Sequence, residues 1–305
     1  MQVLPMKQLN LNFTTKNDAK RFVDNCEVKF HTDLDAAIDH VFDDGGVKIV
    51  TLSGPTCSGK TTTANTLTRR IREEGKHAVV LSIDDFFLDR ADRNNVSGEV
   101  PDYDSVKAID LGYLEYFTDR LMKGKSILVP KYDFTATSRV GYTEYIPDSR
   151  DIYIFEGIQA VYPEITRLFA HEFRSIFISV EESVAYGDSM LRREDIRLMR
   201  RIVRDHKFRG ATAEFSFHLW QGVRANEEAN IFPNAGNCDI YINSLLDYEP
   251  FVIAHHLIPL LDTVPRDSIY RDEADELRAK IAPYENDLFE DSMIPADSVF
   301  REFIG

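Results

Sequence analysis

The chain has 305 residues, which is enough for one large domain or for a core domain with appendages. Apolar residues make up 43% of it, so it can bury a sizeable core and wholesale disorder is excluded. With 36 basic and 51 acidic residues the formal charge is −15, and such a surface repels DNA, RNA and anionic membranes. We therefore expect no nucleic-acid and no membrane partner, and any anionic ligand needs a local group of positive charges.

No targeting signal or membrane span is evident in the sequence. Residues 1–13 lack the basic start and sustained apolar stretch of a secretory signal. No window approaches the ~18 apolar residues of a membrane helix. The three cysteines, Cys26, Cys57 and Cys238, are too far apart to indicate a metal site or a disulfide framework. We expect a reducing, cytoplasmic location.

The predicted elements begin with a mixed region, residues 1–45, which carries a helical pattern at 33–43. From Val47 onward, short apolar runs alternate with longer amphipathic segments. This alternation is typical of a parallel β-sheet with helices on both faces. Buried strands are predicted at residues 47–53, 78–83, 126–129, 152–155, 175–180 and 239–243. Helices are predicted at residues 60–74, 105–123, 163–172, 183–208 and 212–229.

The strand pattern stops at about residue 250. Residues 250–262, 268–282 and 284–290 have helical patterns, and an irregular tail follows. We therefore expect three parts. They are an N-terminal extension at residues 1–45, an α/β domain at 46–248 and a C-terminal helical appendage at 249–305.

Residues 54–61, GPTCSGKT, directly follow the first predicted strand and fit the pattern G-x-x-x-x-G-K-[ST]. The two glycines let the backbone turn tightly around phosphate oxygens, and the next helix points its N-terminal amides at the same anion. Lys60 can reach the β- and γ-phosphates, and the Thr61 hydroxyl can bind Mg²⁺. This context predicts a P-loop NTPase-type fold rather than a simple glycine-rich turn. The predicted ATP site is Gly54, Pro55, Thr56, Cys57, Ser58, Gly59, Lys60, Thr61 and Thr62.

A P-loop alone does not separate GTPases, ATPases, motors and kinases. The N/T-K-x-D motif with which GTPases read the base is absent from the sequence, and the acidic surface disfavours a helicase-type ATPase. A small-molecule kinase remains. The choice between ATP and GTP as phosphoryl donor stays open.

Two acidic strand ends support a kinase. Asp84 and Asp85 follow the second predicted strand, where a carboxylate can accept the proton of an attacking hydroxyl and help to hold Mg²⁺. A helix or turn cap is the alternative. Glu156 ends the predicted strand at 152–155 and has the form of a Walker B metal ligand. The predicted metal ligands are therefore Thr61, Glu156 and Asp84.

Seven arginines gather in residues 192–209 of this otherwise acidic chain. The spacing of Arg193, Arg197, Arg200 and Arg204 places them on one helical face. They form either a solvated face paired with Asp and Glu or a lid that stabilises the charge of a transferring phosphoryl group. The net charge favours the lid, although spacing does not reveal which arginines are only salt-bridged. The predicted catalytic residues are Asp84, Lys60, Arg200 and Arg204.

Taken in order, GPTCSGKT, SIDDFF, PDYDSVKAID, PKYDFTATSR, FEG and RLMRRIVRDHKFRG resemble the uridine kinase and phosphoribulokinase family of P-loop kinases. The resemblance covers roughly residues 47–245. The segments FPNAGNCDIYINS and SVFREFIG are similar to a bacterial uridine kinase-like branch related to proteins with a threonyl-tRNA-synthetase-like N-terminal region. The resemblance implies an ATP- and Mg²⁺-dependent kinase that phosphorylates the 5′-hydroxyl of uridine or cytidine. It also implies a homo-oligomer.

The resemblance further implies acceptor-site residues. Asp102 or Asp104 falls near the acid that binds ribose hydroxyls, and Tyr132 matches an aromatic residue beside the base. Family members commonly have a histidine where this chain has Thr137, and threonine supplies no imidazole to a base. We expect core packing for Phe134. The predicted substrate contacts are Asp102, Asp104, Tyr132, Thr137, Arg139 and Arg197.

Other functions stay open at this stage. The acceptor can be another sugar or a sugar phosphate. The chain can also be an ATP-binding regulatory protein with little turnover, or a scaffold that binds a partner through its C-terminal helices.

Overall fold

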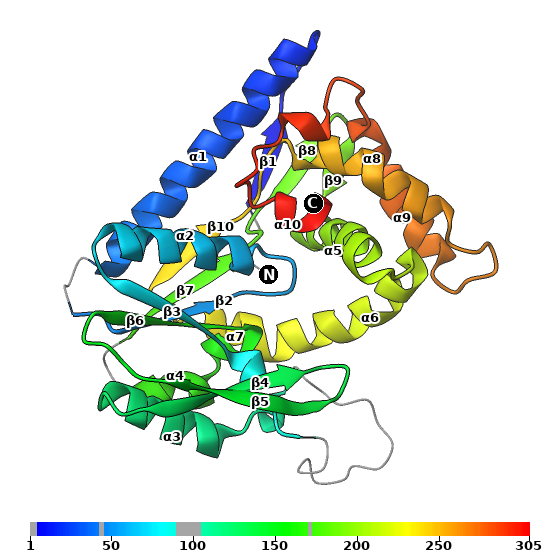
Figure 1. Cartoon of the computed structure of the whole chain (residues 1–305). Helices are drawn as coiled ribbons and strands as arrows, with labels where there is room; N and C mark the ends of the chain where they lie inside the picture. Colours follow the sequence, from blue (N-terminus) through cyan, green and yellow to red (C-terminus); the bar gives the residue numbers. More distant parts are fainter. Residues whose placement is uncertain (1–4, 43–45, 90–104, 170–172) are drawn as a thin grey trace.

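The computed structural model describes residues 5–42, 46–89, 105–169 and 173–305 (Figure 1). A five-stranded parallel sheet in the order β10-β7-β2-β6-β3 forms its centre. All five residues of the central strand β2 are buried, as expected for a parallel strand covered on both faces. The fold class and five of the six predicted strands are confirmed. The strands are β2 Ile49–Ser53, β3 His77–Ser82, β6 Asp151–Glu156, β7 Phe173–Ser179 and β10 Ile240–Asn243.

Helices cover both faces of this sheet (Figure 1). On one side α2 (Lys60–Glu73) and α1 (Lys16–Phe42) share a core with the sheet. On the other side α3 (Leu111–Met122) and the short α4 (Pro163–Thr166) belong to a second core. The helix predicted at 33–43 is thus the end of a much longer one. The helix predicted at 105–123 begins only at Leu111, because Asp110 caps it by accepting a hydrogen bond from Tyr113 N (2.9 Å).

The strand predicted at 126–129 exists but does not join the parallel sheet. It is the start of β4 (Ile127–Asp133), which pairs antiparallel with β5 (Ser138–Tyr145) in a separate hairpin. Leu128 is 48% exposed, so the hairpin is not covered on both faces. The prediction of a buried parallel strand was wrong, because a short apolar run does not by itself distinguish these two environments.

The prediction of a helix at 183–208 was wrong for its first turns. Residues there form β8 (Ser183–Tyr186) and β9 (Ser189–Leu191), an antiparallel pair joined by Gly187 and Asp188. Gly187 has a φ of 57°, and a Gly-Asp pair between apolar residues is a hairpin signal that the helical periodicity concealed. The N-terminal strand β1 (Met6–Leu9) pairs parallel with β8. The arginine-rich helix α5 begins only at Arg193 and ends at Arg209.

The C-terminal third is helical and packs into the same core as the sheet. Buried residues of α1, β7, α8 and the C-terminal tail, such as Leu34, Ile178, Leu257 and Phe303, belong to one cluster. Residues 284–290 do not form the predicted helix, because the Asn286 side chain accepts a hydrogen bond from Leu288 N (3.0 Å) and favours a turn. The helices are α6 Ala213–Asn226, α7 Phe232–Ala235, α8 Glu249–Asp262, α9 Arg271–Ile281 and α10 Arg301–Ile304.

Crossing a membrane takes a long, apolar helix, and the described part of the chain contains none.

Candidate active site

The carboxyl ends of three neighbouring strands bring the predicted chemistry to one edge of the sheet. Glu156, the last residue of β6, lies opposite Leu52 of β2 on one side and Ser82 of β3 on the other. Gly54 follows Leu52 by two residues, and Asp84 follows Ser82 by two. The strand register therefore places the start of the predicted phosphate loop, Glu156 and Asp84 along one edge, where open α/β sheets bind their ligands.

The loop at residues 54–59 depends on its two glycines. A Cβ added at Gly54 would lie 2.1 Å from the carbonyl oxygen of Ile178 in β7, so only glycine lets these backbones approach. Gly59 has a φ of 94°, and a Cβ there would lie 2.5 Å from Cγ2 of Val299 in the C-terminal tail. The loop is thus wedged between β7 and the tail, which fixes its shape.

Other loop residues complete an anion cradle. Lys60 donates to the carbonyl oxygens of Gly54 (3.0 Å) and Pro55 (3.1 Å), so its ammonium lies folded over the loop. Cys57 is buried and has a φ of 59°, which is rare for a residue other than glycine. Ser58 Oγ is buried without a hydrogen-bond partner. Thr61 is exposed at the first turn of α2, and Thr62 is partly exposed.

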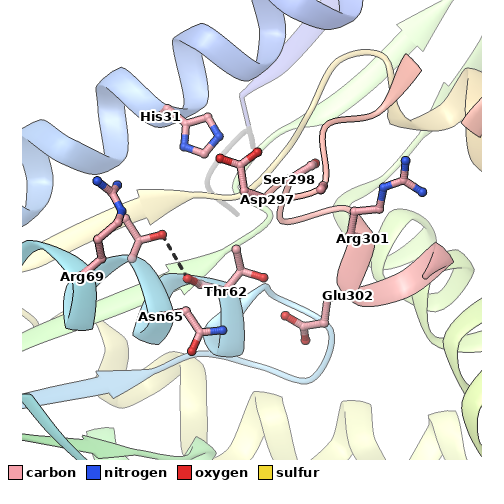
Figure 2. A pocket seen from close by; sticks show the side chains of 10 residues that line it. His31, Thr62, Asn65, Arg69, Asp297, Ser298, Arg301 and Glu302 are labelled. Carbon is pink, nitrogen blue, oxygen red and sulfur yellow. Dashed lines mark hydrogen bonds between the residues drawn. The ribbon is translucent and has the colours of Figure 1, made fainter. Parts of the chain in front are cut away.

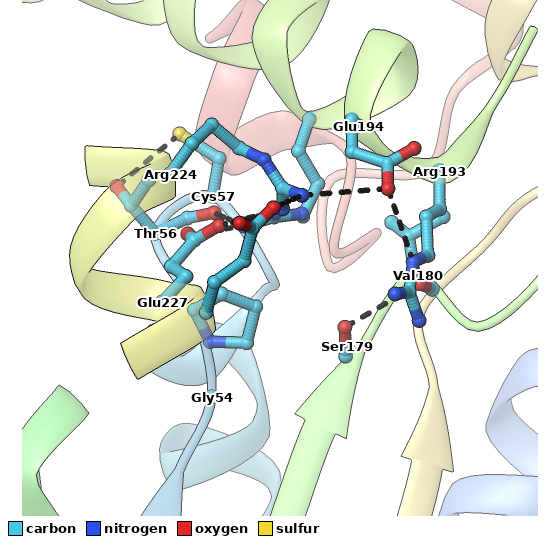
Figure 3. A network of polar contacts seen from close by, with 12 residues as sticks. Gly54, Thr56, Cys57, Ser179, Val180, Arg193, Glu194, Arg224 and Glu227 are labelled. Atoms are coloured by element: carbon cyan, nitrogen blue, oxygen red, sulfur yellow. Dashed lines mark hydrogen bonds and ion pairs between the residues drawn. The ribbon is translucent and has the colours of Figure 1, made fainter. Parts of the chain in front are cut away.

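Two of the predicted lid arginines donate to backbone carbonyl oxygens of the loop, next to the polar contacts around Thr56, Cys57 and Glu227 that Figure 3 shows. Arg197 is fully buried and makes two contacts with the Glu227 carboxylate, at 2.5 and 2.6 Å, while its Nη1 also reaches the Thr56 carbonyl oxygen (3.4 Å). Arg224 contacts the same Glu227 carboxylate (3.1 Å). Arg197 therefore has protein partners on both sides, and contact with substrate is left as an untested expectation.

Arg200 repeats this arrangement one turn later. Its guanidinium donates to both oxygens of Glu249, to the Cys57 carbonyl oxygen (3.0 Å) and to Ser244, and it lies 4.7 Å from the Phe303 ring. Arg204 is less buried and uses Nε and Nη2 to contact Asp205 (3.0 and 2.8 Å). The arginine face thus points at the back of the phosphate loop, and Arg197 and Arg200 are the salt-bridged members that spacing could not identify.

The carboxyl group of Glu156 has an elevated pKa. Burial raises the pKa of Glu156, the Lys60 ammonium lowers it, and the carboxylate of Glu302 raises it further. Glu302 belongs to α10, and its Oε2 is buried without a hydrogen-bond partner. The C-terminal tail therefore lies beside the loop. The sequence did not predict this position, because the tail follows the predicted kinase domain by some 50 residues of chain.

At the acceptor end, Asp84 is half-buried in the short turn Ile83–Phe86 after β3. The neighbouring Asp85 accepts a hydrogen bond from Tyr132 N (3.0 Å), and burial raises the pKa of its carboxyl group. Asp85 thus ties the β4–β5 hairpin to the end of β3.

The hairpin holds the remaining predicted substrate contacts. Tyr132 is buried with its ring centroid 5.5 Å from that of Phe87. Thr137 lies in the hairpin loop with a φ of 53°. Arg139 pairs with Asp110 (3.0 Å) and donates to the Phe86 carbonyl oxygen (3.2 Å). These partners indicate that Arg139 holds the hairpin against α3.

Two expectations at this end had different outcomes. Core packing of Phe134 was wrong: its side chain is 51% exposed, because it sits at the open end of the hairpin beside Phe87 and Tyr132. Asp102 and Asp104 lie in residues 90–104, outside the described residues.

A different group of possible metal ligands occurs at the opposite edge of the sheet. Ligand atoms of His77, Asp148 and Asp151 lie within 4.8 Å of one another. His77 and Asp151 begin β3 and β6, whereas Asp84 and Glu156 lie at the other ends of these strands. Asp151 already accepts hydrogen bonds from the Tyr145 hydroxyl and from Asp148 N. This group is therefore remote from the phosphate loop.

Comparison with known proteins assigns the family. The model of the phosphoribulokinase / uridine kinase family matches residues 49–249. Uridine-cytidine kinase B of Dictyostelium discoideum is 29% identical over 197 residues, or 64% of this chain and 73% of that protein. The uridine kinase of Ureaplasma urealyticum serovar 10 is 27% identical over 211 residues, or 69% and 93% of the two chains.

Solved structures with related folds were also found. A possible uridine kinase from Bacillus stearothermophilus aligns with 70% of this chain and 99% of its own, at 17% identity and a TM-score of 0.48. A D-glycerate 3-kinase from Cryptococcus neoformans aligns with 70% of this chain and 88% of its own, at 14% identity and a TM-score of 0.45. The sequence match, which spans residues 49–249 and contains the phosphate loop, Asp84 and Glu156, shows that this chain is a phosphotransferase of the phosphoribulokinase / uridine kinase family.

Proposed function

We propose that this protein transfers the γ-phosphoryl group of ATP to the 5′-hydroxyl of a nucleoside, with uridine or cytidine as acceptor. The observation that carries the proposal is the register of β2, β6 and β3. It brings the start of the loop, Glu156 and Asp84 into a row along one edge of the sheet, which supports the roles of phosphate loop, metal ligand and general base that we propose for them. Curated relatives named uridine kinase support the acceptor class.

The residues present fit ATP and Mg²⁺. Gly54 and Gly59 let the loop pack against β7 and the C-terminal tail, where any side chain would clash, and Lys60 supplies a cation at the loop. Thr61 and Glu156 offer the hard oxygen ligands that Mg²⁺ prefers, with Asp84 as a further candidate. When bound by these residues, Mg²⁺ would supply positive charge that offsets the charge of the phosphate oxygens.

The chain's own residues then have distinct roles. Asp84 orients the acceptor hydroxyl and takes its proton as the new bond to the γ-phosphorus forms and the bond from that phosphorus to the leaving oxygen of ADP breaks. Lys60 moves from the loop carbonyl oxygens to the transferring phosphoryl group and stabilises its negative charge, assisted by Arg204. Arg197 and Arg200 hold the loop from behind, so that its amides stay aimed at the phosphates. Most of the rate would come from this positioning and charge stabilisation.

The contacts of the described arginines favour an unphosphorylated acceptor. Arg139 is paired with Asp110, and Arg120 donates to the Ser126 carbonyl oxygen through Nε and Nη2 (2.9 and 2.6 Å). Both arginines of residues 105–139 thus already donate to protein groups. Another sugar remains the alternative acceptor, since Thr137 supplies no imidazole to a base. The three free cysteines support our proposal of a cytoplasmic location.

A release assay for ADP tests the proposal. Purified full-length protein is incubated with Mg-ATP and a panel of nucleosides and sugars, and Lys60→Ala serves as the control for contaminating kinases. We expect turnover with uridine and cytidine that the control lacks. Turnover with a sugar but with no pyrimidine nucleoside would show that the proposed acceptor is wrong and that the proposed reaction, phosphoryl transfer from ATP, is right. No turnover with any acceptor, in a protein that still binds ATP, would favour a regulatory nucleotide-binding role.

A further inference from the structure

A cavity lies over the start of α2, beginning at Thr62, and residues outside the matched family region help to build it. The cavity has a volume of about 320 Å³, within the range of small-ligand pockets. Its floor is one face of α2, and its walls are α1 and the C-terminal tail (Figure 2). The lining residues are His31, Thr62, Asn65, Thr66, Arg69, Ala296, Asp297, Ser298, Arg301 and Glu302.

The floor of the cavity lies where the nucleoside part of a bound nucleotide must extend beyond its phosphates. In a P-loop the backbone amides hold the α- and β-phosphates, and the lysine reaches the β- and γ-phosphates. The ribose is attached to the α-phosphate, so it leaves the loop over the first turns of the helix. In α2, Thr62, Asn65, Thr66 and Arg69 share one face by their spacing, while the opposite face is buried against the sheet. The cavity therefore begins at the position that the ribose must occupy.

The wall formed by the C-terminal tail is fixed before any ligand arrives. Val299 is fully buried against the position of Gly59, and Phe303 is fully buried beside Arg200. The Arg301 guanidinium donates to the carbonyl oxygens of Asp291, Ile294, Pro295 and Gly305. These contacts hold the tail in a single shape. A preformed wall lowers the entropy that a ligand would lose on binding.

The chemistry of the walls suits a nucleoside rather than an apolar ligand. His31 presents an imidazole ring on which a base can stack, and Asp297 presents a carboxylate that accepts hydrogen bonds from hydroxyl or amino groups (Figure 2). Asn65, on the floor, adds an amide that both donates and accepts. His31 and Asp297 both lie outside residues 49–249, which the family model matches.

The acceptor end lies on the other side of the phosphate loop. Tyr132 and Phe87 belong to the core that contains α3 and α4, whereas α1, α2 and Val299 belong to the core on the opposite face of the sheet. A nucleoside in the cavity would thus not compete with an acceptor held near Asp84. The cavity is therefore placed for the donor.

We propose that the C-terminal tail, residues 296–302, and His31 of α1 form the binding site for the nucleoside part of the phosphoryl donor, with His31 and Asp297 as specificity-determining residues. This inference rests on the proposed function, since it assumes that the loop holds a nucleoside triphosphate. It assigns to segments on either side of the family domain a direct part in donor binding.

Calorimetry with two probes tests the site in the full-length protein. ADP carries a nucleoside and inorganic tripolyphosphate does not, yet both bind the phosphate loop. We expect Asp297→Ala and His31→Ala each to weaken ADP binding by about tenfold, as the loss of a hydrogen bond to a charged group or of a stacked ring implies. Tripolyphosphate binding should stay unchanged. The matched controls Asp287→Ala and Val28→Ala remove exposed residues outside the cavity and should alter neither ligand.

Three outcomes separate this inference from the proposed function. ADP binding that is unchanged in both cavity variants would overturn the inference, and so would an equal loss of ADP and tripolyphosphate binding. Wild-type protein that binds ADP but phosphorylates no acceptor would refute the proposed function, while the comparison of the two probes still decides the site. In a turnover assay the cavity variants should raise KM for ATP and leave KM for the acceptor unchanged at saturating ATP.

Discussion

Arg200 and Glu249 form an ion pair in which both side chains are completely buried, with contacts of 2.6 and 2.7 Å between the guanidinium and the carboxylate. The same guanidinium donates to the carbonyl oxygen of Cys57 inside the phosphate loop (3.0 Å). Arg200 thus joins the loop to the first turn of α8. A carbonyl held from behind turns the neighbouring amides toward the front of the loop, where phosphates bind.

Removal of Arg200 should therefore damage both the fold and the loop. We expect Arg200→Met to lower the free energy of unfolding by about 3–5 kcal/mol, because it leaves the Glu249 carboxylate buried without its partner. Chemical denaturation measures this change. The double variant Arg200→Met, Glu249→Leu should recover much of the stability, since both charges are then gone. It should still show a raised KM for ATP, because Cys57 has lost its donor. Full recovery of both properties in the double variant would show that Arg200 acts only through Glu249.

The adjacent acids Asp84 and Asp85 should respond differently to the same change. We expect Asp84→Asn to lower kcat by roughly 10²–10⁴-fold and to leave ATP binding intact, because it removes the proposed base alone. Asp85→Asn keeps an oxygen that can accept the hydrogen bond from Tyr132 N, so its kcat should change much less. Initial rates at saturating substrates, with ATP binding by calorimetry, check both. The reverse order of the two effects would exchange the roles of these residues.

Lys60 should matter for turnover more than for the fold. Its ammonium donates to two loop carbonyls, and those carbonyls can bind water instead if the side chain is shortened. We expect Lys60→Met to lower kcat/KM by about 10²–10³-fold, as for the loss of one donor to a transition-state charge. The midpoint of thermal unfolding should stay nearly constant. A large loss of stability would instead make Lys60 a structural residue of the loop.

The residues at the carboxyl ends of the sheet strands could be predicted from the sequence, because each is marked by its immediate neighbours in the chain. The eight residues GPTCSGKT determine a phosphate loop through backbone geometry and helix polarity, and Glu156 and Asp84 end strands whose apolar runs are unbroken. Parallel strands in one sheet run in the same direction, so these carboxyl ends lie together at one edge of the sheet. The five sheet strands followed from the same reasoning.

The remaining parts depend on contacts between residues far apart in the chain. Nothing local marks Glu227 and Glu249 as the partners of Arg197 and Arg200, which lie 30 and 49 residues earlier. The position of Val299 against Gly59 depends on the whole path of α8 and α9. The β8–β9 hairpin was mistaken for helix because the Gly187–Asp188 turn is short and apolar residues surround it. These features are set by tertiary packing rather than by periodicity.

Thr137 offers a test of stored backbone strain at the acceptor end. Its φ of 53° is unfavourable for a β-branched residue and costs on the order of 1–3 kcal/mol. Asparagine tolerates this conformation, so Thr137→Asn should raise the free energy of unfolding by about 1 kcal/mol in chemical denaturation. The neighbouring exposed substitution Ala136→Asn serves as the control and should not stabilise the protein. Strain kept for acceptor binding would appear as a higher KM for the acceptor in the stabilised variant.

Glu156 and Glu302 link the pH dependence of the protein to its C-terminal tail. Burial raises the pKa of Glu156, and the Glu302 carboxylate raises it further against the opposing effect of Lys60. The folded state therefore binds a proton to Glu156 more tightly than the unfolded state does. Stability contributed by this group is full below the unfolded pKa and is lost as the pH rises through the folded pKa. Above the folded pKa, where the group is ionised, Glu156 lowers the stability of the fold.

Two isosteric variants separate these effects. Glu156→Gln removes the buried charge, so it should raise the midpoint of thermal unfolding at a pH above the folded pKa of Glu156 while lowering turnover by at least about 10-fold, since the proposed metal ligand is gone. Glu302→Gln keeps Glu156 but removes the neighbouring charge that elevates its pKa. The acidic limb of the kcat/KM profile should then move to lower pH, because Glu156 ionises more readily. An acidic limb that stays in place in Glu302→Gln, or that moves to higher pH, would show that the tail carboxylate does not act on Glu156.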